Sequence, residues 1–383
     1  SEENSGLFKF SRWIFIETMK VGIPKERADG EARVATTPEI AKKLVAGGLT
    51  VLLERGAGAA AYYSDEAYEQ AGVQLTDAAG ALACDIVAKV RRPLEDEVAA
   101  MREGSVFIGH AETCEQDSLI SAMHQRKITI LAMERIPRIS RAQSMDALSS
   151  QSNIAGYRAV IEAASHFGRF IPLMMTSAGS AKPARVVVLG AGVAGLQAIA
   201  TARRLGGDVY AYDVRAETRE QIQSLGAKVI ELEVGEGGAG EGGYAKELSE
   251  EGKAKQQALL ADELAKAHVI ITTALIPCRP APVLITEEVV RRMREGSVII
   301  DLAAATGGNC PLTESDRVVV KHGVILVGHT NYPAKMPSDA SAFYAKNVAN
   351  LLDIMLDRSG EDIILKDLDE DEITRDAQLK LSA

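Results

Sequence analysis

The sequence predicts an α/β protein made of two doubly wound domains, each built on a mostly parallel sheet. Three observations predict this fold: a length of 383 residues, a repeated alternation of apolar strands with helices, and a polar break near the middle. A single core stops growing at about 250–300 residues, so a chain of this length is expected to form two domains. Strands that alternate with helices form parallel sheets covered on both faces.

The first series of strands and helices begins at residue 20. Thr37 is the expected N-cap of a helix that has Pro38 at its first position, and a glycine pair ends this helix. Ser64 opens the next helix in the same way. Strands are expected at residues 21–23, 51–53, 85–90, 105–108 and 128–133, and a further helix at residues 118–126.

A polar segment at residues 135–153 breaks this alternation, and a helix runs from it to about residue 170. A second series then follows. Its strands are expected at residues 186–189, 209–212, 228–232, 269–273 and 298–302, and its helices at residues 194–205, 217–225, 245–267 and 287–293. The tail is expected to be helical over residues 338–356, and the acidic residues 367–371 to form a solvated surface segment.

Composition and charge exclude several classes of protein. With 46% hydrophobic and 25% charged residues, the chain is neither disordered nor collagen-like. The 43 basic and 53 acidic side chains give a net charge of −10, which repels nucleic acid. The longest apolar runs fall far short of the roughly 20 residues that a membrane-spanning helix needs. The sequence therefore predicts neither a nucleic-acid partner nor a membrane span.

Cysteine and histidine usage predicts no metal site. The four cysteines, at positions 84, 114, 278 and 310, are too widely spaced for a disulfide framework or a Cys-x-x-Cys site. A reducing compartment is the simplest interpretation. His322 and His329 lie across an expected strand pair and do not have a zinc spacing.

The strongest motif is Gly-Ala-Gly-Val-Ala-Gly at residues 190–195, which follows an apolar strand and opens a helix. In that context the G-x-G-x-x-G pattern predicts a Rossmann-like dinucleotide site. Gly190 makes the turn, Gly192 lets the backbone approach the pyrophosphate, and Gly195 lets helix and strand pack closely. The alternative is a glycine-rich turn without a ligand.

Asp213 lies 18 residues after Gly195, at the end of the next strand. Its carboxylate would accept hydrogen bonds from ribose hydroxyls and repel a 2′-phosphate, which favours NAD(H) over NADP(H), although Arg215 weakens this preference. The equivalent turns of the first half lack the motif, so one dinucleotide per chain is expected.

Two further segments allow two interpretations each. Arg138, Gln143, Asp146 and Ser149 could converge on a nicotinamide carboxamide, whereas composition alone favours an exposed linker. The position of this segment between two nucleotide-type halves favours the site. Residues 235–243 hold six glycines in nine positions and form either a lid or a slack connection; glycine content alone favours the connection.

Several long motifs resemble the NAD(H)-binding component of proton-translocating NAD(P) transhydrogenase. They are the fingerprint with its Asp-Val-Arg at residues 213–215 and the segments RISRAQSMDALSSQSNIAGYRAV at 138–160, GGYAKEL at 242–248, TTALIP at 272–277 and DLAAATGGNC at 301–310. The resemblance covers about residues 20–352. It implies a cytoplasmic homodimer, peripheral at the inner membrane, that docks on an NADP(H)-binding and a membrane-spanning component.

The resemblance also implies direct hydride transfer from NADH to NADP⁺, coupled to proton translocation by the membrane partner. Arg138, Gln143 and Asp146 would position the nicotinamide. The other cofactor contacts implied are Ile139, Ser140, Arg141, Ser149, Gly190, Ala191, Gly192, Val193, Gly195, Asp213, Val214, Arg215, Gly243, Tyr244, Gln256 and Leu275. Tyr244 matches the tip of a loop that closes on nucleotide, which reverses the interpretation from glycine content.

The resemblance implies domains of residues 20–150 with 330–383, and 151–329, because the family returns its C-terminal helix to the first half. Direct transfer between two nicotinamides needs approach and orientation, with no general acid or base. No transit peptide precedes Met19, which favours a bacterial cytoplasm.

Alanine dehydrogenase, a related family, is the main alternative. Its substrate-holding Arg and Lys match Arg33 and Lys89, but its catalytic aspartate matches Ala305, and its histidine only loosely matches His110. A keto-acid reductase needs such an acid or base. A third alternative, an NAD-binding regulatory module, would leave the 138–149 segment without a purpose.

Overall fold

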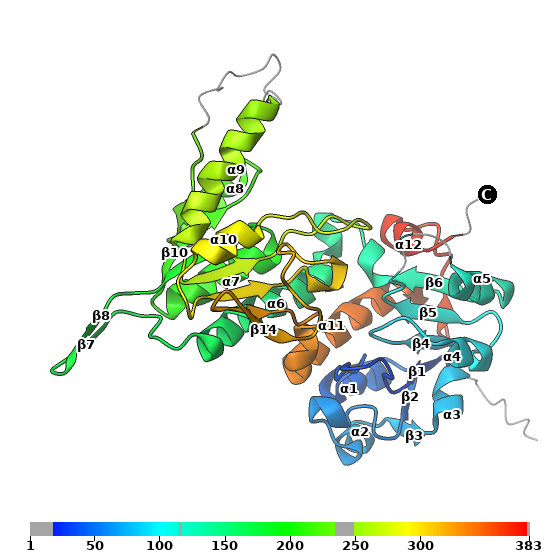
Figure 1. The fold of residues 1–383 in the computed structure, drawn as a ribbon. Helices are drawn as coiled ribbons and strands as arrows, with labels where there is room; N and C mark the ends of the chain where they lie inside the picture. The colour runs from blue at the N-terminus through cyan, green and yellow to red at the C-terminus, as the bar shows by residue number, and fades with distance from the viewer. Residues whose placement is uncertain (1–17, 113, 115–116, 234–248, 381–383) are drawn as a thin grey trace, which may run out of the picture.

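The computed structural model describes residues 18–112, 114, 117–233 and 249–380. Two sheets lie in separate bodies joined by long helices (Figure 1). The first sheet has strand order β3-β2-β1-β4-β5-β6, and every pairing in it is parallel. Its strands are β1 (Lys20–Ile23), β2 (Thr50–Glu54), β3 (Gln74–Thr76), β4 (Ile86–Ala88), β5 (Val106–Gly109) and β6 (Thr129–Ala132).

Five helices connect the strands of this first sheet. They are α1 (Pro38–Ala46), α2 (Asp65–Gln70), α3 (Ala78–Leu82), α4 (Glu95–Ala100) and α5 (Ser118–Gln125). Thr37 caps α1, since its side chain accepts a hydrogen bond from the Ile40 amide at 3.4 Å. The sequence did not predict α3 and α4, because helices of five or six residues are too short to show a helical period.

The second sheet has strand order β11-β10-β9-β12-β13-β15-β14, and only β14 within it is antiparallel. Its strands are β9 (Arg185–Leu189), β10 (Asp208–Tyr212), β11 (Lys228–Val229), β12 (Val269–Thr272), β13 (Val298–Asp301), β14 (Val318–Lys321) and β15 (Val324–Val327). Its helices are α7 (Val193–Arg204), α8 (Thr218–Ser224), α9 (Glu250–Ala265) and α10 (Glu287–Arg292). The predicted fold class, two Rossmann-like α/β halves, is confirmed.

Two long helices join the halves: α6 (Ala147–His166) and α11 (Pro337–Met355). On α6, a Cβ at Gly156 would lie 2.1 Å from the Ala194 carbonyl oxygen, so α6 and α7 are in backbone contact there. Helix α11 returns to the first half, where Tyr344 and Leu351 are buried in the core with residues of β1 and β2. The halves are therefore joined by two packed helices.

The C-terminal stretch corrects one expectation. It forms β16 (Leu356–Asp357), β17 (Ile364–Leu365) and α12 (Glu372–Ala377), and Gln378 bridges to Leu131 of β6. Leu368 and Ile373 are buried in the first core, so this stretch is not simply a solvated surface segment. The alternation of acidic with apolar residues hides this, because each buried side chain is isolated in the sequence.

A hairpin that the sequence did not predict extends from the second half. It consists of β7 (Met174–Thr176) and β8 (Gly179–Ala181), and it projects away from the body of the molecule (Figure 1). The strands have three residues each, too few for a clear alternation. Elsewhere the chain forms short 3₁₀ turns, at Ala59–Ala61, Met133–Arg135, Ser140–Met145, Ala304–Thr306 and Pro333–Lys335.

Within the described ranges, no helix combines the length and the apolar character that crossing a bilayer requires.

Replacing Gly156 by alanine tests the contact between α6 and α7. The new methyl group would overlap the Ala194 carbonyl, so we expect the free energy of unfolding to fall by about 1–3 kcal/mol. Gly168→Ala is the matched control, because a Cβ there has no atom within 4 Å. Denaturant unfolding of both variants measures the difference; equal stability would show that α6 yields without cost.

Candidate functional site

The glycine turn after β9 has the shape that its motif predicts. Gly190 has φ +92°, and a Cβ on it would lie 2.5 Å from the Thr273 hydroxyl oxygen. A Cβ on Gly195 would lie 1.8 Å from the Gly190 carbonyl oxygen, whereas one on Gly192 would meet nothing within 4 Å. Gly190 and Gly195 are thus required by close packing. Gly192 leaves open space at the amino end of α7, where backbone N–H groups attract anions.

Asp213 lies beside this turn at the end of β10. Its Oδ2 accepts the Ala191 amide at 2.7 Å, and its two oxygens accept the backbone and guanidinium of Arg215 at 2.9–3.0 Å. Burial raises the pKa of Asp213, but the Arg215 and Ala191 hydrogen bonds outweigh it, and the pKa lies below its usual value. Asp213 is therefore an ionised acceptor. Arg215 is 52% exposed and free to move aside for a ligand.

A pocket of about 290 Å³ opens next to Asp213. It is lined by Asp213, Val214 and Arg215 of the β10–α8 loop, by residues 229–233, and by Gln256 of α9. Val214 is 82% exposed, which leaves its apolar side chain available to a flat ring. The structure thus brings together four of the predicted contacts at the expected adenosine end.

The polar segment at the start of α6 is partly assembled. Asp146 is the N-cap of α6, and its carboxylate accepts the Ser149 amide at 2.9 Å and the Ser149 hydroxyl at 2.5 Å. Gln143 lies in the preceding 3₁₀ turn with an exposed side chain, and Arg138 is also exposed. Two predicted residues are thus in contact, and two project from the same short segment.

Other residues predicted from this segment have structural partners. Arg141 makes a bidentate ion pair with Asp371 near the C-terminus, at 2.8 and 2.9 Å. Ile139 packs against the first core, and Ser140 is exposed. Gly243 and Tyr244 lie outside the described residues.

The loop after β12 borders the glycine turn through Thr273, whose hydroxyl donates to the Leu189 carbonyl at 3.0 Å. Leu275 is 58% exposed and presents an apolar edge, as expected of a cofactor neighbour. The fully buried Asn309 holds this loop: its Oδ1 accepts the Thr272 hydroxyl at 2.6 Å, and its Nδ2 donates to the Ala274 carbonyl at 2.8 Å.

Sequence reasoning did not single out Asn309. Its own backbone is held by Asp301, which ends β13 and accepts the Asn309 amide at 3.1 Å. Gly307 and Gly308, both with positive φ, turn the chain back toward β12. The signal was present in a buried strand that ends in Asp and is followed by Gly-Gly-Asn, but its partner loop lies more than 25 residues away.

Comparison with known proteins identifies the family. The alanine dehydrogenase/PNT N-terminal domain matches residues 22–155 and the corresponding C-terminal domain matches residues 159–376. The first of the separate chains that make up NAD(P) transhydrogenase subunit alpha in Rhodospirillum rubrum is 53% identical over 361 residues, covering 92% of this chain and 94% of the relative. The chain belongs to the alanine dehydrogenase/PNT family, on its transhydrogenase branch. The resemblance stated from the motifs is confirmed.

Two solved structures represent the two branches of this family. A transhydrogenase from Sinorhizobium meliloti superposes with a TM-score of 0.80 at 45% identity, covering 88% of this chain and 94% of that one. An L-alanine dehydrogenase superposes with a TM-score of 0.73 at 27% identity, covering 87% and 89%. Fold is shared by both branches, so side chains must distinguish their chemistry.

The two cations that match the substrate-holding residues of alanine dehydrogenase are neutralised by neighbouring carboxylates. Arg33 donates to both oxygens of Glu31 at 2.8 Å and to Gln151 of α6 at 2.9 Å. Lys89 donates to both oxygens of Glu97, at 2.9 and 2.8 Å. Both cations are buried. A substrate carboxylate would have to displace an internal partner of each.

Burial shifts the pKa values of the acids and the histidine in this cluster. Burial raises the pKa of Glu31, but hydrogen bonds and charge from Arg33 outweigh it, and the pKa falls to about 2. Burial raises the pKa of Glu26 to about 7 against the opposing charge of Lys89. Burial lowers the pKa of His110, whose Nδ1 lies 2.9 Å from the Val90 carbonyl oxygen. The cluster supports the fold and holds His110 neutral.

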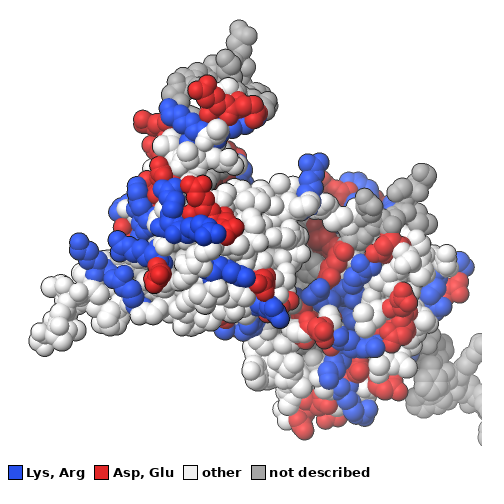
Figure 2. Space-filling view, in the orientation of Figure 1, with Lys and Arg blue, Asp and Glu red and all other residues white. Residues whose placement is uncertain are grey.

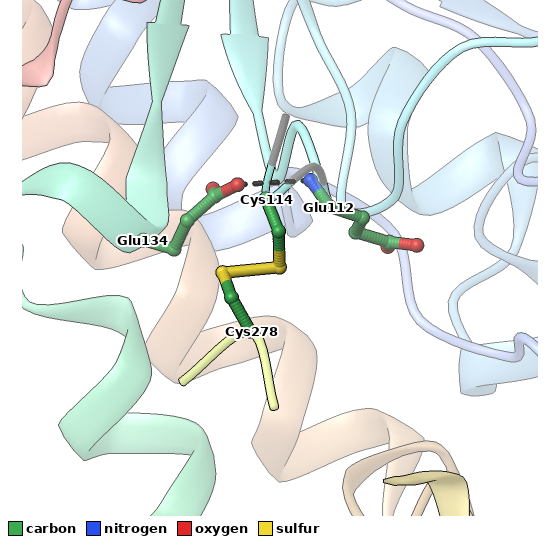
Figure 3. Close-up of a disulfide and its surroundings, with 4 residues drawn as sticks. All are labelled: Glu112, Cys114, Glu134 and Cys278. Atoms are coloured by element: carbon green, nitrogen blue, oxygen red, sulfur yellow. Dashed lines mark hydrogen bonds between the residues drawn. A yellow bond between two sulfur atoms is a disulfide. The ribbon is translucent and has the colours of Figure 1, made fainter. Parts of the chain in front are cut away.

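One expectation is wrong at the edge of this site. Cys114, after β5, and Cys278, after β12, form a disulfide between the two halves, with their Cα atoms 5.3 Å apart (Figure 3). Their separation of 164 residues gave no sign of pairing. The fold brings them together because each follows the carboxyl end of a strand that faces the junction of the halves. Cys84 and Cys310 are free and buried, and burial raises the pKa of each to about 11.

Replacing Asn309 by alanine tests the support of the β12 loop. Buried polar groups of Thr272, Ala274 and Pro282 would lose their partner, which we expect to cost at least about 2 kcal/mol of unfolding free energy. NADH affinity, measured by fluorescence titration where the variant is folded, is expected to fall as well. Unchanged affinity with reduced stability would limit Asn309 to a structural role.

Acid stability tests the Glu31–Arg33 pair. Because the pKa of Glu31 drops from its ordinary 4.5 to about 2 on folding, its contribution is complete above pH 4.5 and is lost as the pH falls toward 2. Glu31→Gln should lose about 3 kcal/mol at pH 7, since the buried Arg33 keeps its charge. The difference from wild type should vanish near pH 2 in denaturant unfolding. Glu39→Gln, in an exposed pair with Lys43, should change little.

Proposed function

We propose that this chain binds NAD(H) between its two halves and passes hydride directly to NADP⁺ held by a partner component. The arrangement that carries the proposal is the glycine turn with ionised Asp213, set beside an interior whose cations are already paired. The first feature suits a nucleotide without a 2′-phosphate. The second leaves no free cation among these residues for a keto-acid carboxylate.

The residues present fit the nucleotide. Gly192 and the amino end of α7 offer open space and N–H groups for the diphosphate. Asp213 would accept the adenosine ribose hydroxyls once Arg215 moves aside, and Val214 and Gln256 would line the adenine pocket. Arg138, Gln143, Asp146 and Ser149 would hold the nicotinamide and its ribose.

The chain's own contribution to the reaction is positioning. When bound, the nicotinamide ring supplies or accepts the hydride at carbon. Gln143 has both an amide donor and an acceptor to match the carboxamide, and Asp146 is oriented by its bonds to Ser149. Direct transfer releases no proton from an oxygen or amine, so neutral, buried His110 has no acid–base task.

The components that complete the reaction lie outside this chain. The 53% identical relative is named as the first of several pieces of subunit alpha, which implies further subunits. We assign NADP(H) binding to one partner component and proton translocation to a membrane-spanning one. The chain would then be peripheral to the inner membrane on its cytoplasmic side, held there by its partners.

Nucleotide titration tests the binding proposal. Wild type is expected to bind NADH at least about tenfold more tightly than NADPH, because Asp213 repels a 2′-phosphate. Asp213→Ala should weaken NADH binding about tenfold and reduce this preference, as measured by calorimetry. Glu217→Ala, on the same loop but outside the pocket lining, is the control. Tighter binding of NADPH than of NADH by the wild type would overturn the proposal.

Turnover distinguishes transhydrogenation from its main alternative. Hydride transfer to an NADP⁺ analogue is expected only when the NADP(H)-binding component is added, whereas pyruvate with ammonia should give no NADH oxidation. Gln143→Ala should reduce coupled transfer more than it reduces NADH affinity, because it acts on orientation. Oxidation of NADH by pyruvate and ammonia without a partner would favour an alanine-dehydrogenase-like enzyme.

A homodimer is the assembly we propose, with the β7–β8 hairpin as its contact. Phe170, Leu173 and Met175 at this hairpin are 55–77% exposed, and the projecting tip carries no charge in Figure 2. A two-stranded hairpin is at best marginally stable alone, so a covering surface is needed. Because closed twofold pairs are the commonest assemblies, a second copy is the occupant we propose.

Met175→Asp is expected to shift the chain from dimer to monomer. A charge on the hairpin would be buried without a partner in the contact, which raises the dissociation constant at least about tenfold. Sedimentation equilibrium measures the mass, with Thr176→Asp of the same hairpin as a comparison for general disruption. A wild-type chain that is monomeric at micromolar concentration would refute the homodimer.

A further inference from the structure

The disulfide between Cys114 and Cys278, termed here the interdomain clasp, joins the two halves (Figure 3). Cys114 belongs to the first half, in the loop between β5 and α5, and Cys278 to the second half, in the loop between β12 and α10. Apart from the continuous chain through α6 and α11, this is the one covalent link between the halves among the described residues.

Both ends of the clasp are anchored to rigid structure. On the first side, Glu134 accepts the amides of Ala111 and Glu112 at 2.8–3.1 Å, and Glu112 has φ +51°. On the second side, the loop leading to Cys278 is held by Asn309, and Cys278 itself has φ +60°. The clasp therefore sets the distance between two fixed points on opposite halves.

The second anchor belongs to the loop that borders the proposed nucleotide site. Leu275 is three residues before Cys278, and Thr273 of the same loop contacts the glycine turn. A link to Cys278 therefore limits both the separation of the halves and the freedom of a cofactor-bordering loop.

Exposure distinguishes this pair from the other two cysteines. Cys114 and Cys278 are exposed, whereas Cys84 and Cys310 are buried at 2% and 0%. An exposed disulfide is open to attack by a thiolate. In a reducing compartment such bonds are usually transient and regulatory.

We infer that the interdomain clasp is a reversible redox site that a dithiol reductant opens. A thiolate of the dithiol attacks one sulfur, the Cys114–Cys278 bond breaks, and a mixed disulfide forms. The second thiol of the reductant then closes its own disulfide, leaving two cysteine thiols; two electrons and two protons have passed to the chain. Oxidation by a disulfide of the same class reverses the step.

The consequence for the nucleotide rests on the proposed function. With the clasp closed, the halves are held at one separation, and NADH enters and leaves slowly. With the clasp open, α6 and α11 remain as connections and the halves are free to move apart. The clasp therefore adjusts nucleotide exchange to the thiol redox state.

The first measurement counts thiols in the full chain. After treatment with oxidised or reduced dithiothreitol and removal of the reagent, the protein is unfolded, alkylated and analysed by mass spectrometry. Alkylation of Cys84 and Cys310 alone is expected in the oxidised form, and of all four cysteines in the reduced form. Four alkylated cysteines after oxidation would overturn the clasp.

The second measurement follows NADH release by stopped-flow fluorescence. We expect release from the oxidised form to be at least about fivefold slower than from the reduced form. Cys114→Ser and Cys278→Ser should each release NADH at the reduced rate under both treatments, whereas Cys84→Ser should retain the difference. Equal release rates from oxidised and reduced wild type would overturn the regulatory role.

A third measurement separates failure of the clasp from failure of the proposed function. If neither form binds NADH, the proposed function fails, and small-angle X-ray scattering then decides the clasp. The oxidised chain is expected to be more compact than the reduced chain and than Cys114→Ser; equal radii of gyration would overturn the inference.

Discussion

Close approach of backbone to backbone is the constraint on which the rest of this structure depends. The turn after β9, the start of α7 and the middle of α6 come into direct contact because Gly190, Gly195 and Gly156 have no side chain. A methyl group at Gly195 or Gly156 would lie 1.8 or 2.1 Å from a carbonyl oxygen. This packing fixes the amino end of α7 against β9 and docks α6 on the second half.

Charge balance in the first half decides what chemistry the shared fold can perform. Arg33 and Lys89 occupy places that hold substrate in the alanine dehydrogenase branch, yet Glu31, Glu26 and Glu97 surround them. Burying a cation without a partner is costly, and burying it with a carboxylate makes it a structural element. Arg33 also reaches Gln151 of α6, so this ion pair helps to join the halves. A group that binds substrate in one branch therefore supports the fold in the other.

Fold and site could be predicted where the signal is local. Strands and helices alternate with a clear period, and β9 and β12 begin and end within two residues of their expected bounds; α3 and α4 are too short to show a period. The glycine turn, Asp213 and the Asp146–Ser149 cap likewise belong to short motifs. Asn309 acts on a distant loop, and Cys114 meets Cys278 across 164 residues. Only the parallel topology, which places carboxyl ends of strands along one edge, brings such residues together.

The connections between the halves explain why a small covalent link could control a large movement. Helices α6 and α11 pack against each other, with Ser150 donating to Asn347 at 2.7 Å and Gln151 to the Ala340 carbonyl at 3.1 Å. Movement of the halves is therefore restricted to bending about this packed pair, because sliding would break buried hydrogen bonds. The clasp, on loops beyond the carboxyl ends of β5 and β12, opposes that remaining motion. One bond is then sufficient, since the helices have already removed the other degrees of freedom.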